Sequence, residues 1–422
     1  MPRYLFMAIG LTVIGHALSC VIVRQKNTPT VGLLCDALDV LSGLVLATAA
    51  VVALPQWYAT GAIVGYAWLL FLAAKPLGRE SWTIVAGAAL VLAVLKWATV
   101  DTIGSRLAPS YQANRYMPLV NPVMGVGTLL AGSIVAVYAM RRDEIDRWLM
   151  RHRGASPVIR VMSLVVLMMT FALSMEVDRT VAQLAAARAT PWPAMQLELL
   201  GLTMLWTFAL ALHSGLLLKF AGEPFDRKRR LATNGRTMLA LAIKFIVLDS
   251  LLWYAGHGPV NVLPGLNLQV LAGLIVAIGL GLHWWLLDRE GIAWRVGGAM
   301  VLALLLLVGS LEIDRAFDRT AAIATYFDDA SLAKQVALSA YWASFAVAAI
   351  ILGFRFRIAG LRYFGLALLA VSLSKVVLVD LQHLDRGYRV LSFLLLGGLL
   401  LGTSVAYGKL SPKLLEATAE AE

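Results

Sequence analysis

A short charged phrase occurs twice in this sequence, each time where a hydrophobic segment ends. The copies are Ser174-Met175-Glu176-Val177-Asp178-Arg179 and Ser310-Leu311-Glu312-Ile313-Asp314-Arg315. The Glu and the Arg of each copy are three residues apart, so they can pair on one face of a helix, whereas the Asp points elsewhere. Carboxylate and guanidinium groups in this arrangement can bind an ion or an anionic headgroup. Each Asp can therefore face either a neighbouring helix or a ligand.

A second element consists of a lysine deep in an apolar segment and an aspartate five residues later. It occurs three times, as Lys96 with Asp101, Lys244 with Asp249, and Lys375 with Asp380. In an α-helix a five-residue step turns by about 140°, which places the two side chains on different faces. An unpaired charge inside a bilayer costs at least about 2.5 kcal/mol, so each lysine needs a partner. We predict that Glu176 pairs with Lys244 and that Glu312 pairs with Lys375.

Two interpretations of these charges stay open. A charged element that recurs along a chain is typical of structural pairing between helices. The same charges, gathered near the outer membrane boundary, can instead line an outward-facing polar cavity, in which Arg386 and Arg389 would contact phosphate or carboxylate. The candidate residues for binding or for a charge network are Glu176, Asp178, Arg179, Lys244, Asp249, Glu312, Asp314, Arg315, Lys375, Asp380, Arg386, Arg389, Lys96 and Asp101.

Patterns for other kinds of chemistry are weak. His16, His213 and His283 are scattered over different segments and have no Cys or His at ligand spacing, so we predict neither a metal site nor a cofactor. The sequence contains no nucleophile elbow, P-loop or dinucleotide fingerprint. We therefore favour a role other than catalysis.

The segments that must position these charges are long and apolar. Hydrophobic residues make up 60% of the 422 residues, charged residues make up 14%, and the mean hydropathy is +0.77. A soluble protein could not bury this much apolar surface. Because a backbone in hydrocarbon must satisfy its own hydrogen bonds, we predict an all-α integral membrane protein with about 13 transmembrane helices. The predicted spans are 4–23, 31–55, 60–74, 82–99, 117–140, 158–174, 199–220, 238–254, 263–287, 292–311, 337–354, 361–379 and 390–407.

Aligning the charged phrases gives a repeating unit of about 135 residues and four helices. An even number of crossings makes such copies parallel repeats, related by an axis along the membrane normal. We expect amino-terminal helices over 1–157 that form a degenerate copy, four-helix repeats with Glu-x-Asp-Arg over 158–291 and 292–410, and a polar tail over 411–422.

Basic residues gather on alternate connections, as in the run that contains Arg141, Arg142 and Arg147. The positive-inside rule therefore predicts a cytoplasmic carboxyl terminus and an amino terminus on the outer side. The net charge of +11 results from these basic residues in the connections, so no nucleic-acid partner is required to explain it. The expected partners are membrane lipids and an anionic or lipid-linked small ligand.

The carboxyl-terminal part resembles a known family. The resemblance rests on Gly353-Phe354-Arg355-Phe356-Arg357, Leu361-Arg362, Gly365-Leu366, the stretch from Lys375 to Asp380, and the stretch from Tyr388 to Phe393. These motifs are similar to those of the bacterial multi-pass proteins known as domain of unknown function 2339. The similarity is specific over 292–407 and looser in the middle copy. It implies a bacterial inner-membrane location and a repeated helical fold, but no reaction.

Three functions are compatible with these observations. Our hypothesis is that the protein binds or transports a small ion or an envelope-lipid headgroup through an outward-facing polar pocket. One alternative is a membrane scaffold for envelope proteins, in which the charge pairs are purely structural. The other is an enzyme that acts on a lipid-linked glycan at the outer face, with Asp178 or Asp314 as its acid/base.

Overall fold

The computed structural model describes residues 2–25, 29–107, 117–143, 145–147, 157–220, 224–257, 262–286, 292–319 and 330–378, together with a few residues between 394 and 405. Over these ranges the chain is helical, apart from its connections and one isolated bridge between Met117 and Val120. Twelve helices of this described part are long and apolar enough to cross a membrane. The predicted class, an all-α multi-pass membrane protein, is confirmed.

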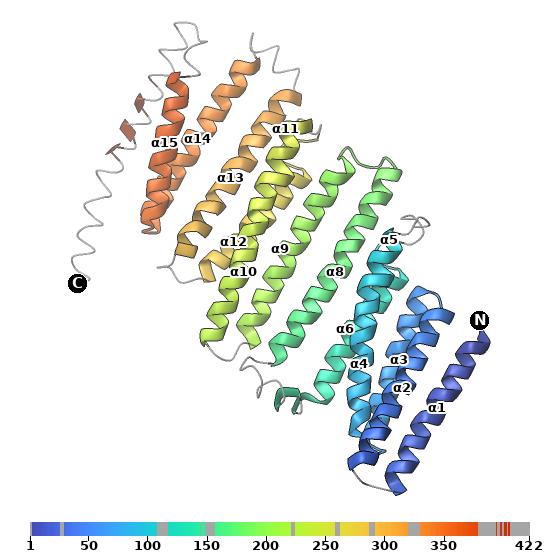
Figure 1. The fold of residues 1–422 in the computed structure, drawn as a ribbon. Coiled ribbons are helices and arrows are strands. Elements are labelled where there is room, and N and C mark those ends of the chain that lie inside the picture. The colour runs from blue at the N-terminus through green and yellow to red at the C-terminus, as the bar shows by residue number, and fades with distance from the viewer. Residues whose placement is uncertain are drawn as a thin grey trace, which may run out of the picture. The chain divides into compact units, whose positions relative to one another are not determined.

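The described helices fall into two compact units, and the first comprises 1–189 and 215–226. Figure 1 shows its long helices, of which α1 packs on α2, α3 on α4, and α6 on α8. Their bounds are α1 (Pro2–Gln25), α2 (Pro29–Ala53), α3 (Gln56–Ala74), α4 (Glu80–Lys96), the short α5 (Ser105–Leu107), α6 (Pro122–Met140) and α8 (Pro157–Ala186).

The second unit comprises 190–214 and 227–422. Within it α12 packs on α13, and α14 packs on α15 (Figure 1). The helices that lie in it wholly or in large part are α9 (Ala194–Phe220), α10 (Pro224–Lys244), the short α11 (Trp253–His257), α12 (Leu268–Leu286), α13 (Ile292–Arg319), α14 (Ala330–Arg355) and α15 (Ala359–Leu378).

Two of these helices change from α-helical to π-helical winding directly after the lysine of a Lys/Asp element. Directly after Lys96, α4 continues as the π-helix η1 (Trp97–Gly104), and directly after Lys244, α10 continues as the π-helix η3 (Phe245–Leu252). In a π-helix the backbone hydrogen bonds join residues five apart instead of four. The wider turn changes which side chains share a face, and this decides the geometry of the charged site.

The residue that follows each lysine is a fully buried aromatic side chain that packs on a glycine of the next long helix. Trp97 lies against Gly127 of α6, and Phe245 lies against Gly273 of α12. The Trp97 indole also donates a hydrogen bond of 2.9 Å to the carbonyl oxygen of Val123. Close contact of a large ring with a glycine allows the helix backbones to approach each other, as is common in membrane helix packing.

Twelve of the predicted spans each correspond to one described helix, and most of the span 390–407 falls outside the described residues. The main difference concerns the charged phrases, which we expected at helix ends. Instead α8 continues to Ala186 and α13 to Arg319, well beyond the phrases. The helices can continue because the charges of each phrase are paired. The division into three parts and the parallel relation between copies stay predictions.

Candidate functional site

Each lysine of the first two Lys/Asp elements pairs with its own aspartate. Lys96 Nζ lies 2.6 Å from Asp101 Oδ1, and Lys244 Nζ lies 2.7 Å from Asp249 Oδ1. Our prediction that these residues occupy different faces was wrong, because it assumed α-helical winding. The π-helical turn, with its hydrogen bonds between residues five apart, brings the two side chains to the same face. Asp101 and Asp249 are completely buried.

A hydroxyl side chain from the preceding long helix completes each pair. Lys96 donates to Thr60 Oγ1 at 2.9 Å, and Thr60 in turn donates to Asp101. In the second unit Lys244 donates to Thr203 Oγ1 at 2.7 Å, and Thr203 donates to Asp249 Oδ2 at 2.6 Å. Neither threonine was among the predicted site residues. The available signal was a hydroxyl residue 36 or 41 positions before each lysine.

The third lysine has the same kind of partner. Lys375 Nζ donates to Ser339 Oγ at 2.7 Å and to the carbonyl oxygen of Gln335 at 3.2 Å. Similarly, Lys244 donates to the carbonyl oxygen of Leu199, four residues before Thr203. The predicted pairing of Lys375 with Glu312 was therefore wrong. Three candidates, Asp380, Arg386 and Arg389, lie outside the described residues.

The glutamates of the charged phrases pair with their own arginines, as the three-residue spacing allows, and not with the lysines that were predicted as their partners. Glu176 Oε1 lies 2.7 Å from Arg179 Nη1, and Glu312 forms the same pair with Arg315. Glu176 is 3% exposed and Arg315 is 2% exposed. Neither glutamate is the partner of a membrane lysine, because each is held by its arginine and by a loop.

That loop precedes α6 in the first unit and α12 in the second. Glu176 Oε2 accepts the backbone N–H of Leu119 at 2.9 Å, and Glu312 Oε2 accepts that of Gly265 at 2.7 Å. Leu119 and Gly265 both have positive φ, 64° and 78° respectively. Each follows a proline and precedes an asparagine by two residues, so a Pro-x-x-Asn motif in the sequence marks both loops, although it was not among the predicted features.

The asparagine of this motif caps the helix that follows the loop. Asn121 Oδ1 accepts the backbone N–H of Met124 at 3.0 Å, at the start of α6. Asn267 Oδ1 accepts the N–H groups of Gln269 and Val270 at the start of α12, and its amide donates to Glu312 at 2.8 Å. Such caps satisfy backbone donors that a helix start leaves open. The glutamate thus joins the charged phrase to the loop of a neighbouring helix.

The two aspartates of the phrases face cations of neighbouring helices. Asp178 pairs with Arg106 of α5, and Asp314 pairs with Lys334 of α14. Both carboxylates thus point away from the Glu–Arg pair, and of the two partners left open for them, a neighbouring helix or a ligand, the structure shows a neighbouring helix. In the first unit all charges of the phrase thereby have a partner of opposite sign.

The loop beside the first charged phrase carries one buried polar atom without a hydrogen bond, Asn121 Nδ2, and the second unit carries three such atoms on its charged phrase and next to the cation that pairs with it. The three are Asp314 Oδ2, Arg315 Nε and Gln335 Oε1. Asp314 and Arg315 are adjacent on α13, and Gln335 follows Lys334, the cationic partner of Asp314. Buried polar groups are almost always satisfied, so each such atom calls for an explanation. We call Glu312, Asp314, Arg315, Lys334 and Gln335 the polar corner.

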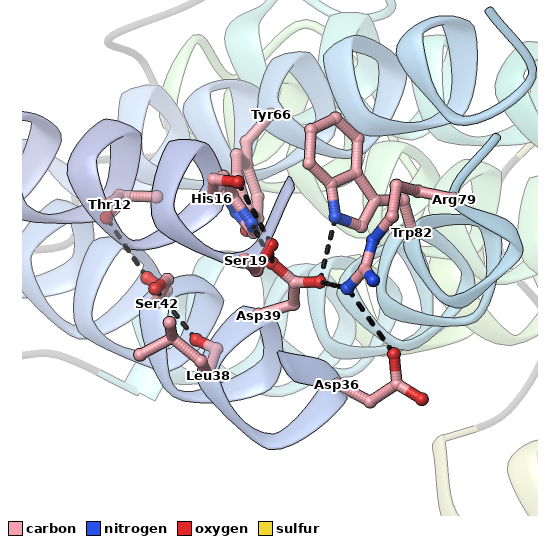
Figure 2. A network of polar contacts seen from close by, with 10 residues as sticks. All are labelled: Thr12, His16, Ser19, Asp36, Leu38, Asp39, Ser42, Tyr66, Arg79 and Trp82. Atoms are coloured by element: carbon pink, nitrogen blue, oxygen red, sulfur yellow. Dashed lines mark hydrogen bonds and ion pairs between the residues drawn. The ribbon is translucent and has the colours of Figure 1, made fainter. Parts of the chain in front are cut away.

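A further buried network lies among α1, α2 and α4 of the first unit and was not predicted (Figure 2). Its centre is Asp39, which accepts hydrogen bonds from His16 Nδ1 at 2.7 Å, from Ser19 at 2.7 Å and from Trp82 Nε1 at 2.9 Å. Arg79 forms an ion pair with the same carboxylate. In the sequence His16 stands alone, because its partner Asp39 is on the next helix.

Among the described residues no group of three or more His, Cys, Asp or Glu side chains could hold a metal ion. The fold and the buried charge pairs together define a multi-pass α-helical membrane protein with ion pairs inside its helix bundles. Residues 2–410 match the family described as predicted membrane protein (DUF2339), and the chain belongs to that family. No curated protein and no solved structure matches it.

Proposed function

We propose that this protein binds or moves a small ion or the polar headgroup of an envelope lipid at the polar corner of its second unit. The observation that carries the proposal is the group of three unsatisfied buried atoms, Asp314 Oδ2, Arg315 Nε and Gln335 Oε1. A buried polar atom without a partner costs about 1–3 kcal/mol, so a ligand that supplies the missing hydrogen bonds would gain affinity there.

The unsatisfied atoms indicate what such a ligand must offer. Asp314 Oδ2 and Gln335 Oε1 are acceptors, whereas Arg315 Nε is a donor. A ligand that contacts Asp314 Oδ2 or Gln335 Oε1 must offer a donor group or a cation, and one that contacts Arg315 Nε must offer an acceptor. The charges of Glu312, Asp314, Arg315 and Lys334 balance, so the corner does not require a ligand of large net charge. A hydrated ion or a headgroup with hydroxyl or amine groups fits this requirement.

The proposal also includes the membrane in which the protein lies and its orientation there. We propose that the protein lies in a bacterial inner membrane, with its carboxyl terminus in the cytoplasm and the polar corner near the outer boundary. The alternation of basic connections supports this orientation. Accessibility labelling of single cysteines placed next to Glu312 and in the connection after α14 would test it, and labelling of both from the same side would contradict it.

The first unit favours a second candidate function, a membrane scaffold with structural charges. There Lys96, Arg106 and Arg179 are each paired with a carboxylate, and the carboxylates of Asp101, Asp178 and Glu176 make hydrogen bonds or ion pairs within the unit. Complete pairing of this kind leaves little for a ligand to contact. Under this alternative the polar corner would be filled by water alone.

The decisive comparison uses two matched variants, Asp314→Asn and Asp178→Asn. Each removes a carboxylate that pairs with a cation of a neighbouring helix, but only Asp314 carries an unsatisfied buried oxygen. Native mass spectrometry of the gently purified proteins should show a discrete bound ion or headgroup in the parent and in Asp178→Asn, and none in Asp314→Asn. Three bare proteins, or three with the same bulk lipids, would favour the scaffold.

A further inference from the structure

The first unit contains a large apolar cavity that is separate from the charged phrases. Its volume is about 890 Å³, and its walls come mainly from α1, α2 and α3. Representative lining residues are Leu5, Ile9 and Val13 of α1, Leu54 directly after α2, and Leu69 and Leu70 of α3. Almost all of these side chains are hydrocarbon, so the cavity favours an apolar occupant.

The cavity follows the long axis of the helices. Its lining on α1 extends from Leu5 to Cys20. At a rise of 1.5 Å per residue these fifteen steps cover about 22 Å. The hydrocarbon core of a bilayer is about 30 Å thick, and α1, α2 and α3 are all candidate membrane spans. The cavity therefore runs along most of the depth of the membrane, parallel to the surrounding lipid chains.

The few polar residues on the cavity wall bind one another or the backbone behind it. His16 is held between Asp39 and the hydroxyl of Tyr66, which lies 2.8 Å from His16 Nε2 (Figure 2). The indole N–H of Trp82 also binds Asp39, and the hydroxyl of Thr12 donates to the carbonyl oxygens of Ala8 and Ser42. A water molecule in a cavity needs two to four polar partners, and these groups are already engaged.

We propose that this cavity holds a hydrocarbon chain of one bilayer lipid. An apolar cavity of this length within the hydrocarbon core is filled most favourably by the chains that surround it, because neither water nor a polar ligand finds free hydrogen-bonding groups there. The buried His16–Asp39–Arg79 network stabilises the wall without contributing to recognition. This lipid site lies in the first unit and does not depend on the proposed function of the polar corner.

A substitution that fills the cavity tests this proposal. Gly65 lines the cavity, and a side chain there meets nothing within 4 Å, so Gly65→Trp should occupy the space without a clash in the backbone. Gly87 on α4 is also exposed and open but does not line the cavity, so Gly87→Trp is the matched control. Each protein is reconstituted in phosphatidylcholine vesicles that contain a lipid with a photoreactive diazirine on its acyl chain.

After illumination, peptide mapping should find label on the buried lining residues Ile63, Leu70 and Ala50 in the parent and in Gly87→Trp, with a several-fold loss in Gly65→Trp. Equal labelling of these residues in both variants would overturn the proposal. A second measurement needs no variant, because delipidation with detergent before illumination should remove label from the exposed Ile84 but leave it on the cavity wall. Loss at both places would mean that only exchanging lipid occupies the cavity.

The experiment also separates the two proposals. Asp314→Asn alters the polar corner of the second unit and leaves the cavity residues unchanged, so its labelling pattern should equal that of the parent. A failure of the polar corner to bind a ligand would not affect this result. Conversely, absence of cavity labelling in the parent would overturn the lipid site and leave the native mass spectrometry comparison of Asp314 and Asp178 intact.

Discussion

Lys96 Nζ lies 2.6 Å from Asp101 Oδ1, five residues further along the same helical segment. Two side chains at this spacing meet because the turn between them is π-helical. The same relationship joins Lys244 to Asp249 across a second π-helix. π-helical turns are rare in proteins, and a large share of those that occur are at functional sites. Here they let a lysine inside a membrane helix carry its counter-ion on its own segment.

The Lys244–Asp249 pair should tolerate removal of both charges better than removal of one. Lys244→Met leaves the completely buried Asp249 carboxylate without its cation, which should destabilise the protein by about 3–5 kcal/mol. The double variant Lys244→Met/Asp249→Leu replaces the pair by apolar groups and should recover most of that loss. Thermal unfolding in detergent measures both effects. Equal destabilisation by the single and the double variant would contradict a pairwise role.

Gly127 should not accept even a methyl group. A Cβ at this position would lie 2.6 Å from Trp97 Cζ2, and the Trp97 ring is completely buried. We expect Gly127→Ala to destabilise the protein by about 1–3 kcal/mol, as overpacked cores do. Gly125→Ala is the control, since a Cβ there meets nothing within 4 Å. Unfolding of the two variants in the same detergent should differ clearly, and coincident curves would argue against the Trp97 contact.

Gly265 should show a conformational penalty without a steric one. Its φ is +78°, and a Cβ would meet nothing within 4 Å, so Gly265→Ala introduces only the strain of the left-handed region. That strain is about 1–2 kcal/mol for a residue with a side chain. Gly256→Ala, in the helical α11 and equally open, should be neutral or stabilising. A neutral Gly265→Ala would mean that the loop adopts another conformation.

Asp39 and Asp36 should differ strongly, although both contact Arg79. Asp39 is completely buried and accepts from four side chains, so Asp39→Asn should cost about 3–5 kcal/mol by removing the buried counter-ion of Arg79. The Asp36 side chain is 52% exposed and lies 3.5 Å from Arg79, so Asp36→Asn should cost less than about 1 kcal/mol. Thermal unfolding of both variants measures the contrast. Similar midpoints would exclude the network as a stabilising element.

The helical class and the positions of most helices follow from local composition. An apolar run of about 20 residues is sufficient to predict a membrane helix, and twelve such runs correspond to described helices. The pairing of Glu176 with Arg179 was equally predictable, because a three-residue spacing on a helix is local information. The ends of α8 and α13 were not predictable, because a charged phrase ends a helix only where its charges stay unpaired.

The sequence by itself determined that this is a membrane protein and that charged residues such as Glu176, Arg179 and Lys96 lie within its apolar segments. Only the tertiary structure decided that Lys96 and Lys244 pair with their own aspartates, because the choice between α- and π-helical winding depends on Thr60, Thr203 and the packing of Trp97 and Phe245. It also decided that His16 and Asp39, 23 residues apart on different helices, form one network. Such contacts depend on how helices pack, and the spacing of hydrophobic residues along the chain does not specify which helix packs against a given helix face.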